Sequence, residues 1–97
     1  ASGAKEEFDK VAEFVQLYSP SKLVIDGHTD SDGDARSNKN LSKDRADAVK
    51  QVMVEGYDFI TDAMVEAHAF GEDRLLVKND TQANKAMNRR IEILVLW

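Results

Sequence analysis

The chain has 97 residues, no cysteine and a formal net charge of −5. This length fits one domain, and the lack of cysteine excludes a disulfide framework, a thiolate metal site and a thiol nucleophile. The negative charge argues against nucleic acid and anionic membrane surfaces as partners, and no apolar run reaches the roughly 18–20 residues that span a bilayer. We therefore expect residues 1–97 to form a single domain without a cofactor.

The first half of the chain predicts a helix, a strand and a long loop. Apolar residues at helical spacing predict a helix over about residues 4–17, which ends before Pro20. The apolar run Leu23-Val24-Ile25 predicts a short buried strand. The polar stretch over residues 28–40 predicts a loop of unusual length, and long ordered loops often carry function.

The second half of the chain predicts two more helices and two more strands. Ser42 and Thr81 are the expected N-caps of the two helices, the second of which runs through about Asn88. Alternating apolar positions predict strands over residues 64–70 and 91–97. Interleaved helices and strands predict an α/β fold, a two-layer α/β sandwich with helices packed on a small mixed β-sheet.

Two charged residues flank the expected loop. Asp30 follows the first strand, at the edge where open α/β sheets commonly bind ligands. Arg45 comes three residues after Ser42, where the free N–H groups of a helix start and a guanidinium together suit a carboxylate. The pair therefore suits a zwitterion, with an ammonium on Asp30 and a carboxylate on Arg45. An intramolecular salt bridge is the alternative.

The chain also carries two ordered blocks of motifs. The first block comprises Gly27-His28-Thr29-Asp30, Gly33, Asn38, Leu41-Ser42 and Arg45-Ala46. The second block comprises Gly71-Glu72, Asn79-Asp80-Thr81 and Asn88-Arg89-Arg90-Ile91-Glu92-Ile93. With these motifs the sequence resembles the OmpA-like C-terminal domain, which implies a fold of the βαβαββ type. No apolar strand precedes Phe8, so we expect the first strand of that fold to be absent.

The resemblance implies a non-enzymatic domain that binds peptidoglycan in Gram-negative envelopes, as in outer-membrane porin-like proteins, peptidoglycan-associated lipoproteins and flagellar stator proteins. It implies that Asp30 and Arg45 hold the diaminopimelate of the peptide stem. It also implies a periplasmic location, in a protein anchored in the outer membrane, or in the inner membrane for a stator protein. The supporting positions that it implies are Thr29, Asn38, Leu41 and Ser42, with Arg90 at the border of the site or as a structural clamp.

Other site chemistries fit the sequence less well. Residues 30–34 are rich in Asp, but an EF-hand loop needs Gly at position six and Glu at position twelve, whereas Gly33 is fourth and Leu41 is twelfth. His28 and His68 lack a third ligand at informative spacing, and no serine motif accompanies them. We therefore expect no metal site and no catalysis. A protein–protein interaction module of the envelope and a weak calcium-binding loop domain stay as alternatives.

The expected closing strand carries apolar residues on both faces. Ile91, Ile93, Val95 and Trp97 share one face, and Leu94 and Leu96 share the other. Such two-sided apolarity is typical of a strand with neighbours at both edges and layers on both faces. Without the first strand of the family's fold, one sheet edge would present unpaired backbone groups, which favours association. We therefore expect self-association through an open sheet edge.

Overall fold

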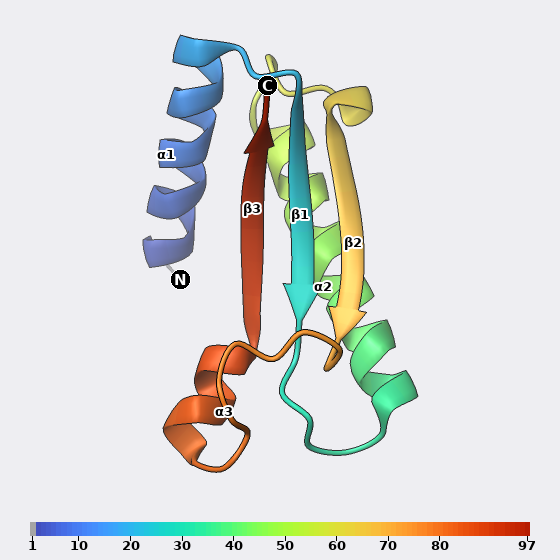
Figure 1. Cartoon of the computed structure of the whole chain (residues 1–97). Coiled ribbons are helices and arrows are strands. Elements are labelled where there is room, and N and C mark those ends of the chain that lie inside the picture. The colour runs from blue at the N-terminus through green and yellow to red at the C-terminus, as the bar shows by residue number, and fades with distance from the viewer. Residues whose placement is uncertain (1) are drawn as a thin grey trace.

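The computed structural model describes the backbone of residues 2–97 and the side chains of residues 5–97. Its elements are α1 (Ser2–Tyr18), β1 (Lys22–His28), α2 (Ala35–Gly56), the short 3-10 helix η1 (Asp62–Met64), β2 (Val65–Gly71), α3 (Gln82–Asn88) and β3 (Arg90–Leu96). The strands form a sheet of order β2-β1-β3, in which β1 runs parallel to β2 and antiparallel to β3 (Figure 1). This arrangement confirms the predicted α/β sandwich on a small mixed sheet.

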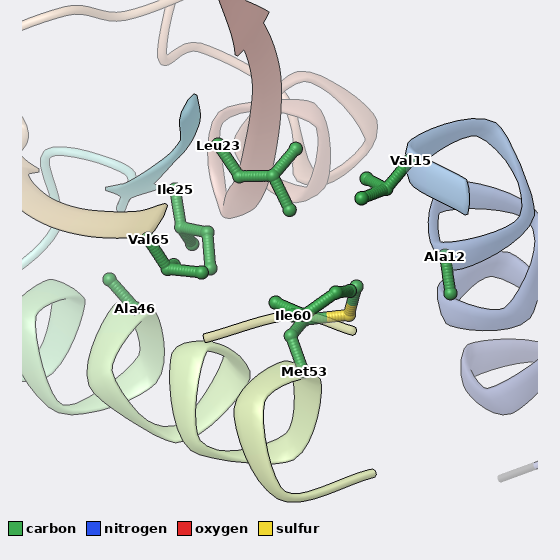
Figure 2. Close-up of a cluster of buried hydrophobic side chains, with 8 residues drawn as sticks. All are labelled: Ala12, Val15, Leu23, Ile25, Ala46, Met53, Ile60 and Val65. Atoms are coloured by element: carbon green, nitrogen blue, oxygen red, sulfur yellow. The ribbon is translucent and has the colours of Figure 1, made fainter. Parts of the chain in front are cut away.

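One face of the sheet packs against α1 and α2 and forms the core. Side chains alternate across a strand, so Leu23 and Ile25 of β1 point to the same face, and both are fully buried. Figure 2 shows them between side chains from both helices. The buried apolar residues of this core are Ala12, Val15, Leu23, Ile25, Ala46, Met53, Ile60 and Val65.

β1 lies very close to α2 at Gly27. A Cβ atom at this position would lie 2.3 Å from the carbonyl oxygen of Ser42, which is far too close for any side chain. A glycine here lets the strand and the helix pack directly against each other. The carboxyl end of β1 is therefore held firmly against the first half of α2.

The predicted start of the second helix is wrong. The helix begins at Ala35, where Asp34 is the N-cap and its Oδ2 accepts a hydrogen bond of 2.9 Å from the backbone N–H of Ser37. Residues 35–37 and 39–41 are exposed and only Asn38 is half-buried, so the first two turns carry no apolar periodicity that would indicate a helix. The loop between β1 and α2 therefore comprises only residues 29–34, and not the predicted residues 28–40.

Ser42 lies inside α2 and is fully buried. Its Oγ donates to the carbonyl of Lys39 at 2.8 Å and accepts from the backbone N–H of Gly71 at 2.9 Å. The hydroxyl therefore joins α2 to the end of β2, which is a structural task and not helix capping. The other predicted cap is confirmed, because Thr81 Oγ1 accepts from the N–H of Asn84 at 3.1 Å.

The other face of the sheet is not covered by α1 or α2. It carries the alternate residues of β1, which are Lys22, Val24, Asp26 and His28. Within the described part of the chain, β2 and β3 are the two edge strands, so the outer side of β3 has no strand partner. None of the helices described is long and apolar enough to cross a membrane.

Candidate ligand-binding site

The carboxyl end of β1, the start of α2, the α3 segment and the start of β3 gather at one end of the molecule (Figure 1). The loop from Thr29 to Asp34 lies at their centre. Thr29 is buried, its N–H donates to the carbonyl of Gly71 at 2.8 Å, and its Oγ1 donates to the carbonyl of Asp30 at 2.8 Å. Thr29 therefore fixes the first turn of the loop against the end of β2.

Asp30 is the central charged group of this end. It is only 7% exposed, and its Oδ2 accepts a 2.6 Å hydrogen bond from Nη1 of Arg89. Its Oδ1 accepts from the backbone N–H of Asp32 at 3.1 Å. Burial by itself would raise the pKa of Asp30, but these two hydrogen bonds and the charges of Arg89 and Lys85 together lower that pKa below its ordinary value. Asp30 is therefore a buried but ionised carboxylate.

Asparagine side chains hold the loop around Asp30. Asn38 on α2 donates from Nδ2 to the carbonyls of Asp30 at 3.3 Å and of Asp32 at 2.9 Å. Asn79 accepts from the N–H of Ser31 at 3.4 Å and donates to Oδ1 of Asp32 at 3.2 Å. The loop is thus tied to α2 on one side and to the α3 segment on the other.

Asn88 stabilises the segment that carries Asn79. Its fully buried side chain accepts from the N–H groups of Leu76 and Val77 at 2.9 and 3.1 Å. It donates to the carbonyl of Val77 at 3.1 Å and to Oδ1 of Asn79 at 3.3 Å. Sequence reasoning placed Asn88 and Asn79 in motifs without assigning either of them a role.

Arg45 lies well inside α2 and is exposed. In the described part of the chain it makes no ion pair with Asp30, which pairs with Arg89 instead. The predicted position of Arg45 in the first turn is wrong, because α2 begins ten residues earlier at Ala35. Arg45 follows Asn38 by two helical turns on the same side of α2, roughly 10 Å along the axis. Helical side chains lean toward the N-terminus, so Arg45 leans toward the loop.

Of the remaining predicted positions, Leu41 lies at the surface, whereas Ser42 and Arg90 make structural contacts. Leu41 is 42% exposed, whereas Ser42 is fully buried. Arg90 donates to the carbonyls of Arg74 at 3.1 Å and of Asn88 at 3.3 Å, which fits the structural clamp of the two roles that the resemblance allowed. Its neighbour Arg89 is the arginine at Asp30. Which of two adjacent arginines faces the loop depends on how α3 joins β3, and the motif alone does not indicate it.

The fold and the site together describe a small α/β sandwich with a buried carboxylate at the end of its central strand. The sequence pattern of the OmpA family matches residues 2–89, so the chain belongs to that family. This membership confirms the resemblance and the prediction that the domain is not an enzyme.

Individual proteins agree with this assignment. The chain is 40% identical over 85 residues to the outer membrane porin F of Pseudomonas fluorescens, covering 88% of this chain and 26% of the porin. The structure of the peptidoglycan-associated lipoprotein from Burkholderia pseudomallei matches with a TM-score of 0.86 at 24% identity, over 98% of this chain and 79% of that one. The cell wall anchor of the T6SS from Pseudomonas aeruginosa matches with a TM-score of 0.83 at 21% identity, over 99% and 68%. The chain spans about a quarter of the length of the porin relatives.

Proposed function

We propose that this domain binds peptidoglycan non-covalently through the diaminopimelate of the peptide stem, and so anchors an envelope protein to the cell wall. The observation that carries the proposal is the buried, ionised Asp30 at the carboxyl end of the central strand of an OmpA-family domain. The likeness to a peptidoglycan-associated lipoprotein and to a cell wall anchor supports it.

Diaminopimelate presents an ammonium and a carboxylate on the same side-chain carbon. In this proposal the ammonium binds Asp30 and the carboxylate binds the guanidinium of Arg45. Arg45 is exposed and lies on the same side of α2 as Asn38, which already contacts the Asp30 segment. A guanidinium suits this task because its planar fork matches both oxygens of a carboxylate.

The neighbouring residues have supporting tasks. Thr29, Asn38 and Ser42 hold the backbone of the loop and the end of β2 in place, so that Asp30 does not need to reorganise on binding. Leu41 is the exposed apolar residue one turn before Arg45 and offers a surface for the methylene chain of the diamino acid. Arg90 clamps the start of β3.

Several relatives are named as outer-membrane or periplasmic proteins, so we propose the periplasm as the location, in a protein anchored in the outer membrane or, for a stator protein, in the inner membrane.

We also propose that the domain self-associates through the outer edge of β3. Exposed Leu94, Leu96 and Trp97 follow this edge, and Trp97 packs on Phe14 and Tyr18 of α1 with ring centroids 5.8 and 6.4 Å apart. A second copy of β3 would pair with the edge and cover these side chains.

Cosedimentation with insoluble sacculi of the diaminopimelate type tests the proposed site. Asp30→Asn and Arg45→Ala should each remove the domain from the pellet, because losing one partner of a charge-assisted contact that the ligand desolvates costs about 2–5 kcal/mol in binding. Lys43→Ala is the matched control, since Lys43 is an exposed cation on another side of α2 that pairs with Asp47 at 3.0 Å.

The same experiment separates the classes of function. A binding domain pellets with the sacculi, a hydrolase clears them, and a protein–protein interaction module does neither. Circular dichroism should show that each variant keeps its fold. Full binding by folded Asp30→Asn or Arg45→Ala would remove the site assignment, and a wild-type domain that stays in the supernatant would remove the function itself.

A further inference from the structure

The sheet face opposite the core carries three side chains that can ligate a metal. Asp26 and His28 alternate along β1 and so point to the same side, and Glu92 of β3 lies directly opposite Asp26 in the antiparallel ladder. One ligating atom from each residue can be chosen so that all three lie within 4.8 Å of one another. The pairing of β1 with β3 therefore fixes this cluster, although His28 and Glu92 are far apart in the sequence.

Two of these side chains are buried, and each has a polar atom without a hydrogen-bond partner among the described residues. His28 is 2% exposed and Asp26 is 8% exposed. Among the described residues, Nδ1 of His28 and Oδ1 of Asp26 have no hydrogen-bond partner, whereas His28 Nε2 lies 3.0 Å from Glu92 Oε2. Folded proteins satisfy most buried polar atoms, so the unpaired atoms indicate a partner other than the described residues.

The ligating groups of the cluster indicate which kind of metal ion would bind. One imidazole nitrogen and two carboxylate oxygens suit a first-row divalent metal, and zinc is commonly held by these groups. The ring of His28 stacks on that of Phe70, with centroids 5.2 Å apart, which fixes its orientation.

The cluster is accessible from solvent, and the positively charged side chain of Arg90 lies beside it. The side chain of Glu92 is 45% exposed, so an ion can reach the buried ligands from solvent. Arg90 Nε lies 3.3 Å from Oε1 of Glu92, whereas Oε2 faces His28. Oε1 of Glu92 thus pairs with the guanidinium of Arg90, while Oε2 remains available to a metal ion. The positive charge of Arg90 should weaken the binding of a cation here.

We propose that Asp26, His28 and Glu92 form a binding site for a divalent transition-metal ion, best matched by zinc, on the outward face of the sheet. This site is separate from the carboxylate that we assign to peptidoglycan binding and does not depend on that function. Metal binding here would join the central strand to β3 through their side chains.

Titration calorimetry of chelator-treated protein with zinc chloride tests this site. We expect one zinc ion per chain, and an affinity at least about tenfold weaker in both Asp26→Asn and Glu92→Gln, which keep the shapes of the side chains. His68→Gln is the matched control, because His68 and Glu66 form an exposed pair at 3.4 Å that could bind zinc adventitiously. The zinc affinity of His68→Gln should equal that of the wild type.

Nitrogen-15 spectra of the histidine rings give a second measurement that does not depend on the mutations. Zinc should shift the ring nitrogens of His28 before those of His68. The proposal is overturned if the wild type binds no zinc, if Asp26→Asn and Glu92→Gln bind it as well as the wild type does, or if the His68 signals move first.

Discussion

Arg89 Nη1 lies 2.6 Å from Asp30 Oδ2, so an internal ion pair already holds the carboxylate on which the proposed ligand site depends. The side chain of Asp30 is 10% exposed and that of Arg89 is 41% exposed. An incoming ammonium must therefore share Asp30 with Arg89 or displace it, and the charge of the buried carboxylate is neutralised in either state.

Replacing Arg89 should change how stability depends on pH. The lowered pKa of Asp30 stabilises the fold above the ordinary pKa of about 4, and this contribution is lost as the pH falls through the lower pKa of the folded state. Arg89→Ala should therefore reduce the free energy of unfolding at pH 7 by about 1 kcal/mol, a modest value because Arg89 is partly exposed. Urea unfolding should show a smaller difference from the wild type at pH 3. Arg36→Ala, at an exposed position near the start of α2, should show no such pH dependence.

Arg45 should distinguish diaminopimelate from lysine. Lysine lacks the second carboxylate, so with a lysine-type stem peptide Arg45 would have no partner. Matched lysine peptides should bind at least about tenfold more weakly, which corresponds to about 1.4 kcal/mol. Arg45→Lys should narrow this difference, because an ammonium cannot make the two-point contact. Equal affinities of the wild type for both peptides, measured by calorimetry, would show that Arg45 does not bind the carboxylate.

Calcium should leave the melting temperature almost unchanged at about millimolar concentration, the range of weak extracellular sites. The acidic groups of the loop already have other partners. Asp30 pairs with Arg89, Asp32 pairs with Lys85 at 3.0 Å, and Asp34 caps α2. An increase in melting temperature that a chelator reverses would support the calcium-binding alternative.

Gly27→Ala should destabilise the domain by about 1–3 kcal/mol or more, because the new methyl group meets the backbone of Ser42 and not a movable side chain. Gly56→Ala is the matched control, since a Cβ atom there meets nothing within 4 Å. Its free energy of unfolding should equal or slightly exceed that of the wild type. Equal stability of the two variants would show that β1 and α2 can separate without cost.

The mean mass in sedimentation equilibrium should rise with protein concentration. In the described part of the chain β3 is an edge strand, and Leu96 on this strand is 46% exposed. Leu96→Lys should reduce the association, because a charge on an edge strand opposes pairing with a second copy. Leu17→Lys adds the same charge at a residue of α1 that is 70% exposed, and it should associate as the wild type does. A strict monomer at high concentration would contradict the prediction.

The sequence predicted the core elements well because their periodicity reflects burial. The strand and helix types follow from alternating and helical patterns, and the structure confirms them. The start of α2 could not be found in this way, because its first turns are polar and exposed and Asp34 is one of several acids in the run. The error moved Arg45 to the start of a helix and gave it neighbouring N–H groups that it does not have.

Contacts between segments that are distant in the sequence could not be predicted from it either. Asp30 was identified as a site residue from its place after a strand, but its partner Arg89 is 59 positions away. Likewise, the sequence offered no third ligand at informative spacing for His28 and His68. Glu92 approaches His28 only through the antiparallel pairing of β1 with β3, which no local spacing indicates. Local patterns indicate which residues are buried, whereas tertiary pairing decides which of them meet.

The place of the proposed binding loop at the end of β1 has a mechanical consequence. β1 is the central strand and is paired along both sides, with β2 and with β3. If Asp30 holds a ligand, a pull along the axis of this strand would load the hydrogen bonds of both ladders together in shear. A load on an edge strand, applied across its axis, would instead break such bonds one after another. The proposed anchor, with its ligand at the tip of the central strand, would resist such a pull until both ladders slip together.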